Sequence, residues 1–359
     1  MSFNKSLVIV AGAGASHEVG LPLGSELKAT ICQGLSFNWR GTERLRGGSD
    51  AILSAIEYLA YHQPGATRDF NEYVMTCRSI FEAIPQALSI DNLVDAHKGN
   101  ERLEICAKIA IAESILDAER KSKLHSNKNP NWKLDFPKIQ NTWYARLWDL
   151  IAAGSRADTV AERLSKIAII TFNYDRCIEH FLHSSLQNFF RVNAQEATAL
   201  LNNLTIHHAY GHLGTLGRTQ GGDVVPFGEQ VSPNLLVNIA KKLKTFTEGT
   251  DESESHVRDI RRYMHSADCI AFLGFAYDRQ NLQLLYGNSG PYPNKNNSTS
   301  VYGTAYGVSN SNRNAIADAL RMHGGYAENE IELVPGMTCE TLLQDYSWSL
   351  SLATDRQTA

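Results

Sequence analysis

The chain has 359 residues, of which 43% are hydrophobic and 20% charged, a composition typical of a globular protein that buries a full core. Its 34 lysines and arginines against 38 aspartates and glutamates give a net charge of -4, which argues against a surface built throughout to bind nucleic acid. The apolar runs fall far short of the roughly 18 residues of a membrane span, and the N-terminus lacks a signal-peptide pattern. The length predicts two or three domains, or one large domain with an insertion.

Six cysteines are scattered along the chain, at positions 32, 77, 106, 177, 269 and 339, and no two of them form a C-x-x-C pair. This spacing argues against a zinc ribbon, so we expect no structural zinc. Scattered cysteines are typical of free, mostly buried thiols in a reducing compartment. The composition therefore predicts a cytoplasmic protein that does not enter a membrane.

The first predicted element is a buried strand, because residues 7–10 read Leu-Val-Ile-Val without interruption. The strand runs directly into a glycine turn at residues 11–16, and a helical pattern begins near Ser25. Strand, glycine turn and helix in this order predict an α/β protein with a Rossmann-like, doubly wound parallel sheet.

Residues 50–165 have helical periodicity almost throughout and are expected to form a large helical insertion. Short apolar segments that predict strands return after it, at residues 166–171, 205–208, 224–227 and 269–273. The predicted domains are therefore an α/β domain of residues 1–49 and 165–359 and a helical subdomain of residues 50–164.

The glycine turn is the first candidate site, with Gly12, Ala13, Gly14 and Ser16 as its members. After a buried strand, glycines let the backbone approach a diphosphate, and the following amides and helix N-terminus stabilise its charge. The alternative is that Gly-Ala-Gly only makes a tight turn. The spacing does not complete the G-x-G-x-x-G fingerprint of dinucleotide-binding proteins, so both interpretations stay open.

The second candidate site is the segment Thr-Phe-Asn-Tyr-Asp, from Thr171 to Asp175, which directly follows a predicted strand. Side chains at the carboxyl end of a parallel strand face the ligand crevice. There the amide of Asn173 can hold a water or a ribose hydroxyl, and Asp175 can order the same network. The alternative is an Asn/Asp turn that caps the next helix.

Three histidines, His207, His208 and His212, lie within six residues of one another, together with Tyr210. A neutral imidazole is a good general base near pH 7. His208 and Tyr210 share one face if the strand continues, whereas His207 faces the other way. No acidic residue or cysteine lies nearby in the sequence, so a metal site is the less favoured alternative.

Two later segments also contain glycine at or near a predicted strand end. Gly274 and Phe275 follow the strand at 269–273, and Gly303 and Thr304 lie further along the chain. Each segment either admits an adenosine or forms an ordinary turn.

The order of these motifs is more specific than any one of them. GAGAS, TFNYD, HHAYGHLG and FLGF follow one another in an order that resembles the sirtuin family of NAD-consuming proteins, and residues 224–229 (VVPFGE) resemble a further segment of that family. The resemblance covers about residues 5–30, 165–230 and 265–310. The chain lacks the zinc module of the deacylating sirtuins, and Tyr210 stands where their histidine precedes a glycine. In these departures it resembles divergent bacterial sirtuin-like domains that hydrolyse NAD in anti-phage defence, among them the HerA-associated type.

The resemblance implies that NAD is the substrate, that nicotinamide and ADP-ribose are the products, and that NAD depletion causes abortive infection. It implies a catalytic Asn173, a general base at His208, and a pocket ordered by Asp175 and Tyr210, although His207 and His212 stay alternatives for the base. The positions implied for NAD binding are Gly12, Ala13, Gly14, Ser16, Thr171, Gly274, Phe275, Gly303 and Thr304. Related domains carry helical insertions, and some act with a HerA-type ATPase or a short Argonaute. We therefore expect a homo-oligomer or such a partner, with nucleic acid involved only indirectly.

Three other functions compete with NAD hydrolysis. A sensor or scaffold would bind NAD or ADP-ribose without turnover, but the intact Asn173 and Asp175 argue against it. An NAD-dependent protein deacylase would need an acyl-lysine groove, which is usually built with the missing zinc module. A plain oxidoreductase is disfavoured by the glycine spacing and by the lack of an acidic residue at 35–39, where a second strand would end.

Overall fold

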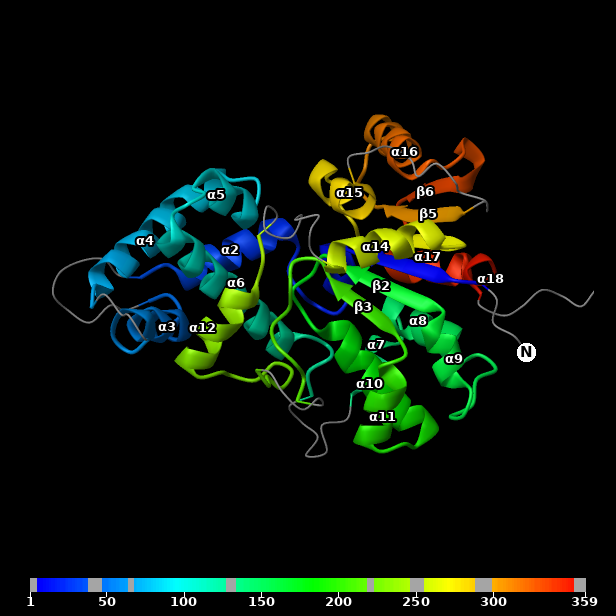
Figure 1. Cartoon of the computed structure of the whole chain (residues 1–359), viewed down its shortest axis with the longest axis horizontal. Coiled ribbons are helices and arrows are strands. Elements are labelled where there is room, and N and C mark those ends of the chain that lie inside the picture. Colours follow the sequence, from blue (N-terminus) through cyan, green and yellow to red (C-terminus); the bar gives the residue numbers. More distant parts are fainter. Residues whose placement is uncertain are drawn as a thin grey trace, which may run out of the picture.

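The computed structural model describes residues 5–37, 47–63, 68–126, 134–217, 223–245, 255–287 and 299–351. A six-stranded sheet forms its centre, and all neighbouring strands are parallel, in the order β3-β2-β1-β4-β5-β6 (Figure 1). The strands are β1 (Leu7–Ala11), β2 (Ile167–Thr171), β3 (Thr205–His208), β4 (Cys269–Leu273), β5 (Ser300–Ala305) and β6 (Ile331–Pro335). The sheet has the strand order of the Rossmann-like α/β fold that the sequence predicted.

Helices cover both faces of this sheet. Those between β1 and β2 are α1 (Ala13–His17), α2 (Gly24–Gly34), α3 (Asp50–Tyr61), α4 (Phe70–Ala83), α5 (Ile90–Ala96), α6 (Glu101–Lys121), α7 (Phe136–Ile139), α8 (Trp143–Ala152) and α9 (Val160–Ser165). Those after β2 are α10 (Cys177–Phe190), α11 (Ala194–Leu201), α12 (Pro233–Lys242), α14 (Ser255–Ser266), α15 (Arg279–Tyr286), α16 (Asn310–Gly324), α17 (Cys339–Asp345) and α18 (Ser347–Leu350). Two short 3-10 turns complete the described elements: η1 (Ile84–Gln86) and η2 (Glu328–Glu330).

Alternation along β1 divides the core into two clusters. Val8 and Val10 pack in one cluster, with α14, α15 and α16, whereas Leu7 and Ile9 pack in the other, with α8 to α11 and α17. Successive side chains of a strand point to opposite faces, and all five residues of β1 are buried. The continuous apolar run is therefore explained by a parallel sheet that is covered on both faces.

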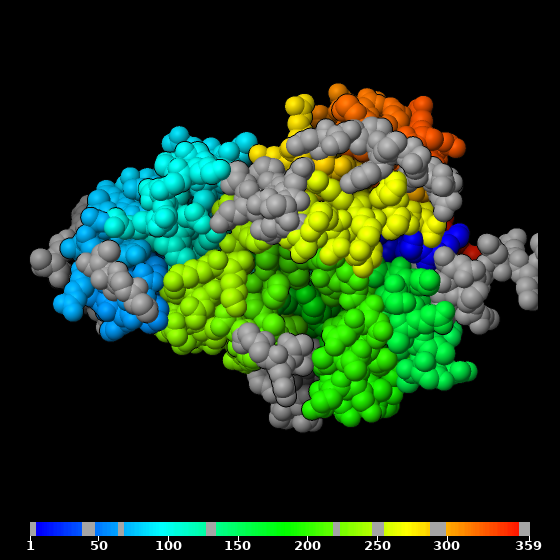
Figure 2. Space-filling view, viewed as in Figure 1, coloured from blue at the N-terminus to red at the C-terminus, as the bar shows by residue number. Residues whose placement is uncertain are grey.

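The helices between residues 50 and 164 fall into two groups. Helices α3 to α6, which we call the helical lobe, pack with one another and with α2 and α12. Helices α8 and α9 pack against the sheet. Figure 1 shows the lobe beside the sheet, and Figure 2 shows yellow-green α12 at the surface next to the blue-to-cyan helices. The domain boundaries at residues 50 and 164 stay a prediction. The contacts place α7 to α9 in the apolar cluster that contains Leu7 and Ile9.

Capping side chains explain where the lobe helices begin. Ser49, Asp69, Ser89 and Asn100 each accept a hydrogen bond from the backbone N–H three residues further on. Such caps satisfy amides that have no partner inside the helix. Local sequence thus defines these four helix starts, and apolar faces then pack the helices together.

The strand predictions were mostly confirmed, with one error and two omissions. β1, β2, β3 and β4 lie where the sequence predicted them, but residues 224–227 are not a strand, since only Val224 forms an isolated bridge, with Thr215. β5 and β6 were not predicted. β5 contains a glycine and begins with an exposed serine, and β6 is a half-exposed edge strand that ends in proline, so neither has a long apolar run.

All six cysteines are free, and five of them are buried, in agreement with the prediction of free, mostly buried thiols. Among the described helices, none is both long and apolar enough to cross a bilayer.

Candidate active site

The turn after β1 and the segment after β4 cross in direct backbone contact. The Gly12 amide donates to the carbonyl of Leu273 at 3.0 Å, and the Gly14 amide donates to the carbonyl of Gly274 at 3.0 Å. These strands are neighbours at the point where the chain reverses direction across the sheet, which is where ligands bind in this fold. The two glycine amides expected to hold a diphosphate are therefore used by the neighbouring segment.

The need for glycine at these positions follows from the same crossing. A Cβ on Gly12 would lie 2.6 Å from the Gly274 oxygen, and one on Gly14 would lie 2.7 Å from the Gly274 Cα. A Cβ on Gly274, whose φ is +56°, would lie 2.2 Å from the Ala15 nitrogen. Close packing between the two backbone segments thus explains all three glycines, a constraint that the tight-turn alternative did not include, while Ala13 begins α1 and Ser16 lies within it.

Asn173 contacts the Gly12 end of this crossing, and hydrogen bonds fix the orientation of its side chain. Its amide nitrogen donates to the Gly12 carbonyl at 2.9 Å and to the Ser16 hydroxyl at 3.0 Å, and its backbone N–H donates to the Thr171 hydroxyl at 3.1 Å. The Gly12 carbonyl can only accept, so the amide nitrogen must face it. The amide oxygen then points elsewhere and has no hydrogen-bond partner among the described residues.

Ser16 links Asn173 to Asp175, so the structure brings these predicted residues into one network. Burial raises the pKa of the Asp175 carboxyl above its usual range, although hydrogen bonds from Ser16 and Cys177 oppose that shift. Asp175 also accepts from the Cys177 backbone N–H at 3.1 Å, at the start of α10. The N-cap position of α10 is Arg176, so Asp175 does not cap the helix as the turn alternative expected; it makes a local turn with Cys177 and joins the polar network through Ser16.

A buried ion pair beside this network was not predicted from the sequence. Arg176 pairs with Glu119 of α6 at 2.5 Å, and the two side chains are 1% and 0% exposed. Glu119 also accepts from the backbone N–H groups of Arg176 and Gly228, and Arg176 donates to the Val225 carbonyl. The pair joins the lobe, the segment after β2 and the VVPFGE segment, three parts far apart in the sequence.

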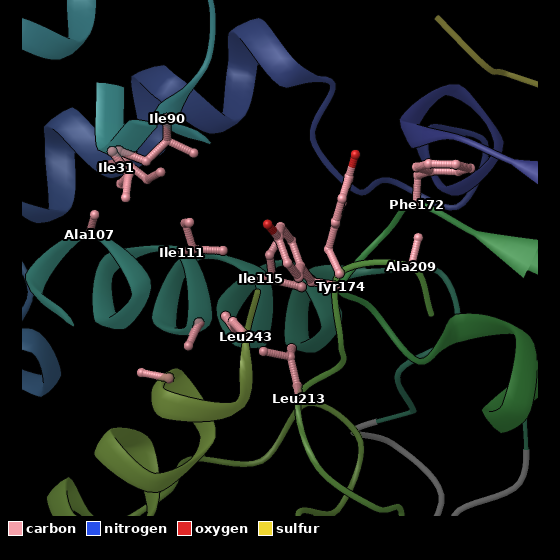
Figure 3. Packing of buried hydrophobic residues seen from close by; sticks show 14 of the residues in the cluster. Ile31, Ile90, Ala107, Ile111, Ile115, Phe172, Tyr174, Ala209, Leu213 and Leu243 are labelled. Atoms are coloured by element: carbon pink, nitrogen blue, oxygen red, sulfur yellow. The ribbon is translucent and has the colours of Figure 1, made fainter. Parts of the chain in front are cut away.

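Tyr174 makes a second link from this segment to the lobe. Its hydroxyl donates to Asp91 of α5 at 3.0 Å and to the Lys244 carbonyl at 3.3 Å. Burial raises the pKa of Asp91 to about 6, and the hydrogen bond from Tyr174 partly opposes this. Figure 3 shows Tyr174 beside Ile115 of α6, in the apolar cluster that continues from the lobe to the strand ends.

His208 lies beside Asn173, and each of its two ring nitrogens faces a hydrogen-bond acceptor. Nδ1 lies 3.0 Å from the Asn173 carbonyl, and Nε2 lies 2.7 Å from Oε1 of Glu179. The His208 side chain is 6% exposed. A general base needs a free lone pair, so the predicted role as base is not open to His208 in this arrangement.

His212 and His207 differ from His208. The His212 ring lies 4.9 Å from the His208 ring, and its Nδ1 lies 3.0 Å from the Gly214 carbonyl, which leaves Nε2 as the acceptor of the neutral ring. Burial and the charge of His208 lower the pKa of His212. His207 lies against Tyr263 of α14, and burial lowers its pKa as well.

Tyr210 and His208 do not share a strand face, because β3 ends at His208. The Tyr210 hydroxyl donates to Asn281 of α15 at 2.5 Å, and its ring packs at 5.6 Å from Phe172. Phe172 in turn lies 5.1 Å from Phe275. Tyr210 and Phe275 therefore belong to a buried aromatic cluster between the strand ends and α15.

The residues expected to bind adenosine are used for packing between β4 and β5. The Thr304 hydroxyl accepts from the Gly274 N–H at 2.8 Å, and the Tyr277 hydroxyl donates to the Thr304 carbonyl at 3.2 Å. A Cβ on Gly303 would lie 2.2 Å from the Tyr277 hydroxyl. Gly303 and Thr304 thus lie inside a strand, where internal contacts account for both.

No protein-family model matches the chain, and no curated protein matches its sequence. In the part of the chain that the structure describes, no three His, Cys, Asp or Glu side chains are grouped as metal ligands would be.

Proposed function

We propose that this protein is an NAD glycohydrolase that cleaves NAD to nicotinamide and ADP-ribose. The observation that carries the proposal is the fixed amide of Asn173, whose nitrogen is held by Gly12 and Ser16 while its oxygen has no partner among the described residues. The amide lies at the carboxyl ends of β1 and β2, where ligands of this fold bind.

Cleavage of the nicotinamide–ribose bond needs charge stabilisation more than a strong nucleophile. As the bond breaks, the ribose gains oxocarbenium character and positive charge, as in other glycosyl cleavages. A preorganised amide oxygen stabilises such a charge without reorganising and can also orient the attacking water. Asp175 accepts from Ser16 and so orders the hydroxyl that holds the Asn173 amide, and nicotinamide departs as a neutral leaving group.

The proton of the attacking water needs an acceptor, and His212 is the better candidate of the three histidines. Its neutral form has an acceptor nitrogen at Nε2, since the Gly214 carbonyl fixes the proton on Nδ1, whereas both nitrogens of His208 face acceptors. A base must be unprotonated near neutral pH, and burial lowers the pKa of His212 in that direction.

The test is to incubate the full chain with NAD and to separate the products by liquid chromatography. The comparison is among wild type, Asn173→Ala and the matched control Asn202→Ala, which changes an exposed asparagine at the end of α11. We expect nicotinamide and ADP-ribose from wild type and control, and a loss of about 100-fold or more in Asn173→Ala. Equal turnover by all three would overturn the proposal.

Binding of NAD or ADP-ribose without turnover is the second candidate. It becomes the better interpretation if His212 does not act as the base, because His208 has no free nitrogen to accept a proton. Calorimetry with NAD and with ADP-ribose separates the two functions, because saturable binding with no product after hours supports a sensor or scaffold.

The biological setting that we propose rests on the resemblance to sirtuin-like defence domains alone. It comprises NAD depletion during phage infection, a homo-oligomer or a partner such as a HerA-type ATPase or a short Argonaute, and no direct role for nucleic acid. Measuring NAD in infected cells that express wild type or Asn173→Ala tests the first part, and light scattering of the purified chain tests the second.

A further inference from the structure

The hydrogen bonds of His208 define its charge state. The Asn173 carbonyl, 3.0 Å from Nδ1, can only accept a hydrogen bond. Glu179 Oε1, 2.7 Å from Nε2, can also only accept when the carboxyl is ionised. Both contacts are satisfied together when both ring nitrogens carry a proton, so the ring is an imidazolium paired with a carboxylate.

The alternative is a neutral ring that receives a proton from Glu179. Burial alone would favour it, but the carboxylate of Glu179 and the Asn173 carbonyl together raise the pKa of His208 above its usual range. In the same way, burial would raise the pKa of Glu179, yet the imidazolium and its hydrogen bond bring it below its usual range. Glu179 also lies in the first turn of α10, where the helix dipole favours a negative charge.

The other titratable groups around the ring act in the same direction or weakly against it. Asp175, from the segment between β2 and α10, adds negative potential that favours the imidazolium. His212, from the segment after β3, and His207, on the opposite face of β3, both have pKa values lowered by burial. They are therefore mostly neutral near pH 7, and Glu179 is the group that most strongly favours the charged ring of His208.

We propose that His208 is a positioning residue, whose charged ring, held by Glu179, fixes the backbone carbonyl of Asn173 and with it the direction of the Asn173 amide. Three further hydrogen bonds hold the same asparagine, from its side-chain nitrogen to Gly12 and Ser16 and from its backbone N–H to Thr171. In this arrangement the proton on His208 stays in place, and the proton of the attacking water goes to another group. The role of Asn173 rests on the proposed function, but the charge state of His208 does not.

The first test is nuclear magnetic resonance of the full chain labelled with 15N-histidine, between pH 6 and pH 9. The Glu179→Gln variant identifies the His208 signals, because it removes the charge that faces Nε2. We expect both nitrogens of His208 to show the chemical shifts of the protonated ring at pH 7.5 in wild type, and a fall in its pKa in Glu179→Gln. A neutral His208 at pH 7.5 would overturn the proposal, whatever the activity of the protein.

The second test uses the sign of the pH dependence of NAD cleavage. A general base must lose its proton to act, so kcat/KM would rise with pH through the pKa of that base. A positioning imidazolium must keep its proton, so we expect kcat/KM to fall as pH rises through the pKa measured for His208. A rise through that value would overturn the proposal.

Variants sharpen this second test. We expect Glu179→Gln to lower kcat/KM about 10-fold and to move its alkaline decline to lower pH, whereas the matched control His97→Gln, at an exposed site on the lobe, leaves both unchanged. An unchanged profile in Glu179→Gln would contradict the proposal. If wild type does not cleave NAD at all, the proposed function fails, and the magnetic resonance test still decides the charge state of His208.

Discussion

Two strand-end regions meet at the Gly12–Gly274 crossing, and they differ in how their polar groups are used. After β4 and along β5, Thr304 accepts hydrogen bonds from both Gly274 and Tyr277. After β2, Asn173 is also held in place, yet its amide oxygen has no partner among the described residues. Both regions contain residues that the resemblance assigned to NAD binding. In the β4–β5 region, contacts within the protein explain why these residues are glycine and threonine.

A motif at a strand end can serve packing or a ligand, and the contacts of its residues separate the two. A glycine whose Cβ would collide with a neighbouring backbone, as at Gly274, is explained without a ligand. Asn173 is different: it is half-buried, its side-chain nitrogen is fixed by two hydrogen bonds, and its oxygen keeps an acceptor available to a ligand. The candidate site therefore lies in the β1–β2 region, and variants in the two regions should differ in their effects.

The largest expected effect lies at the ion pair beside the β2 segment. Replacement of Glu119 by alanine leaves the buried Arg176 without its carboxylate, which typically costs about 3 to 5 kcal/mol in the free energy of unfolding. Urea denaturation measures this loss. The control is Glu82→Ala, which removes a glutamate paired with Arg78 at an exposed site and should cost less than about 1 kcal/mol. Similar losses in the two variants would show that the pair is not buried as described.

A second effect is expected where the two segments cross. In Gly274→Ala the new methyl group meets backbone atoms of Gly14 and Ala15 and takes a φ of +56°, so the loss should be about 2 to 4 kcal/mol. Gly307→Ala is the matched control, because its φ is also positive and nothing lies within 4 Å; it should cost only about 1 to 2 kcal/mol. Equal losses would mean that the close crossing does not exist in solution.

A third experiment separates stability from activity in the two regions. Thr304→Val removes the acceptor of the Gly274 N–H and should cost about 1 to 3 kcal/mol, while NAD turnover by the folded protein stays within a few-fold of wild type. Thr304→Ser keeps the hydroxyl and should recover most of the stability. A loss of turnover in Thr304→Val as large as that in Asn173→Ala would place the β5 residue in the site after all.

The smallest effect expected is the pH dependence of stability from the His208–Glu179 pair. The raised pKa of His208 adds stability below its unfolded pKa, which is lost as pH rises through the folded value. The lowered pKa of Glu179 adds stability above its unfolded pKa, which is lost as pH falls through the folded value. The difference in unfolding free energy between wild type and Glu179→Gln should therefore be largest between about pH 4.5 and 6.5 and should shrink on either side. A difference that grows steadily above pH 7 would contradict the assigned charges.

Local sequence determined much of the molecule. The uninterrupted apolar residues of β1, β2 and β4 predicted a sheet buried on both faces, and the helical periodicity predicted the lobe helices, because each pattern depends on residues close together in the chain. Asn173 and Asp175 were located for the same reason, since both directly follow a strand. β5 and β6 lacked that local pattern and were missed.

Tertiary structure alone decided which side chains work together. Glu119 and Arg176 are 57 positions apart, and Gly12 meets Gly274 only because β1 and β4 are neighbours in the sheet. The partners of His208 depend on where α10 packs, and those partners, not the histidine itself, determine whether its ring holds its proton or releases it. Charge state and free hydrogen-bonding capacity arise from contacts between distant segments, so no motif spacing in the sequence reveals them.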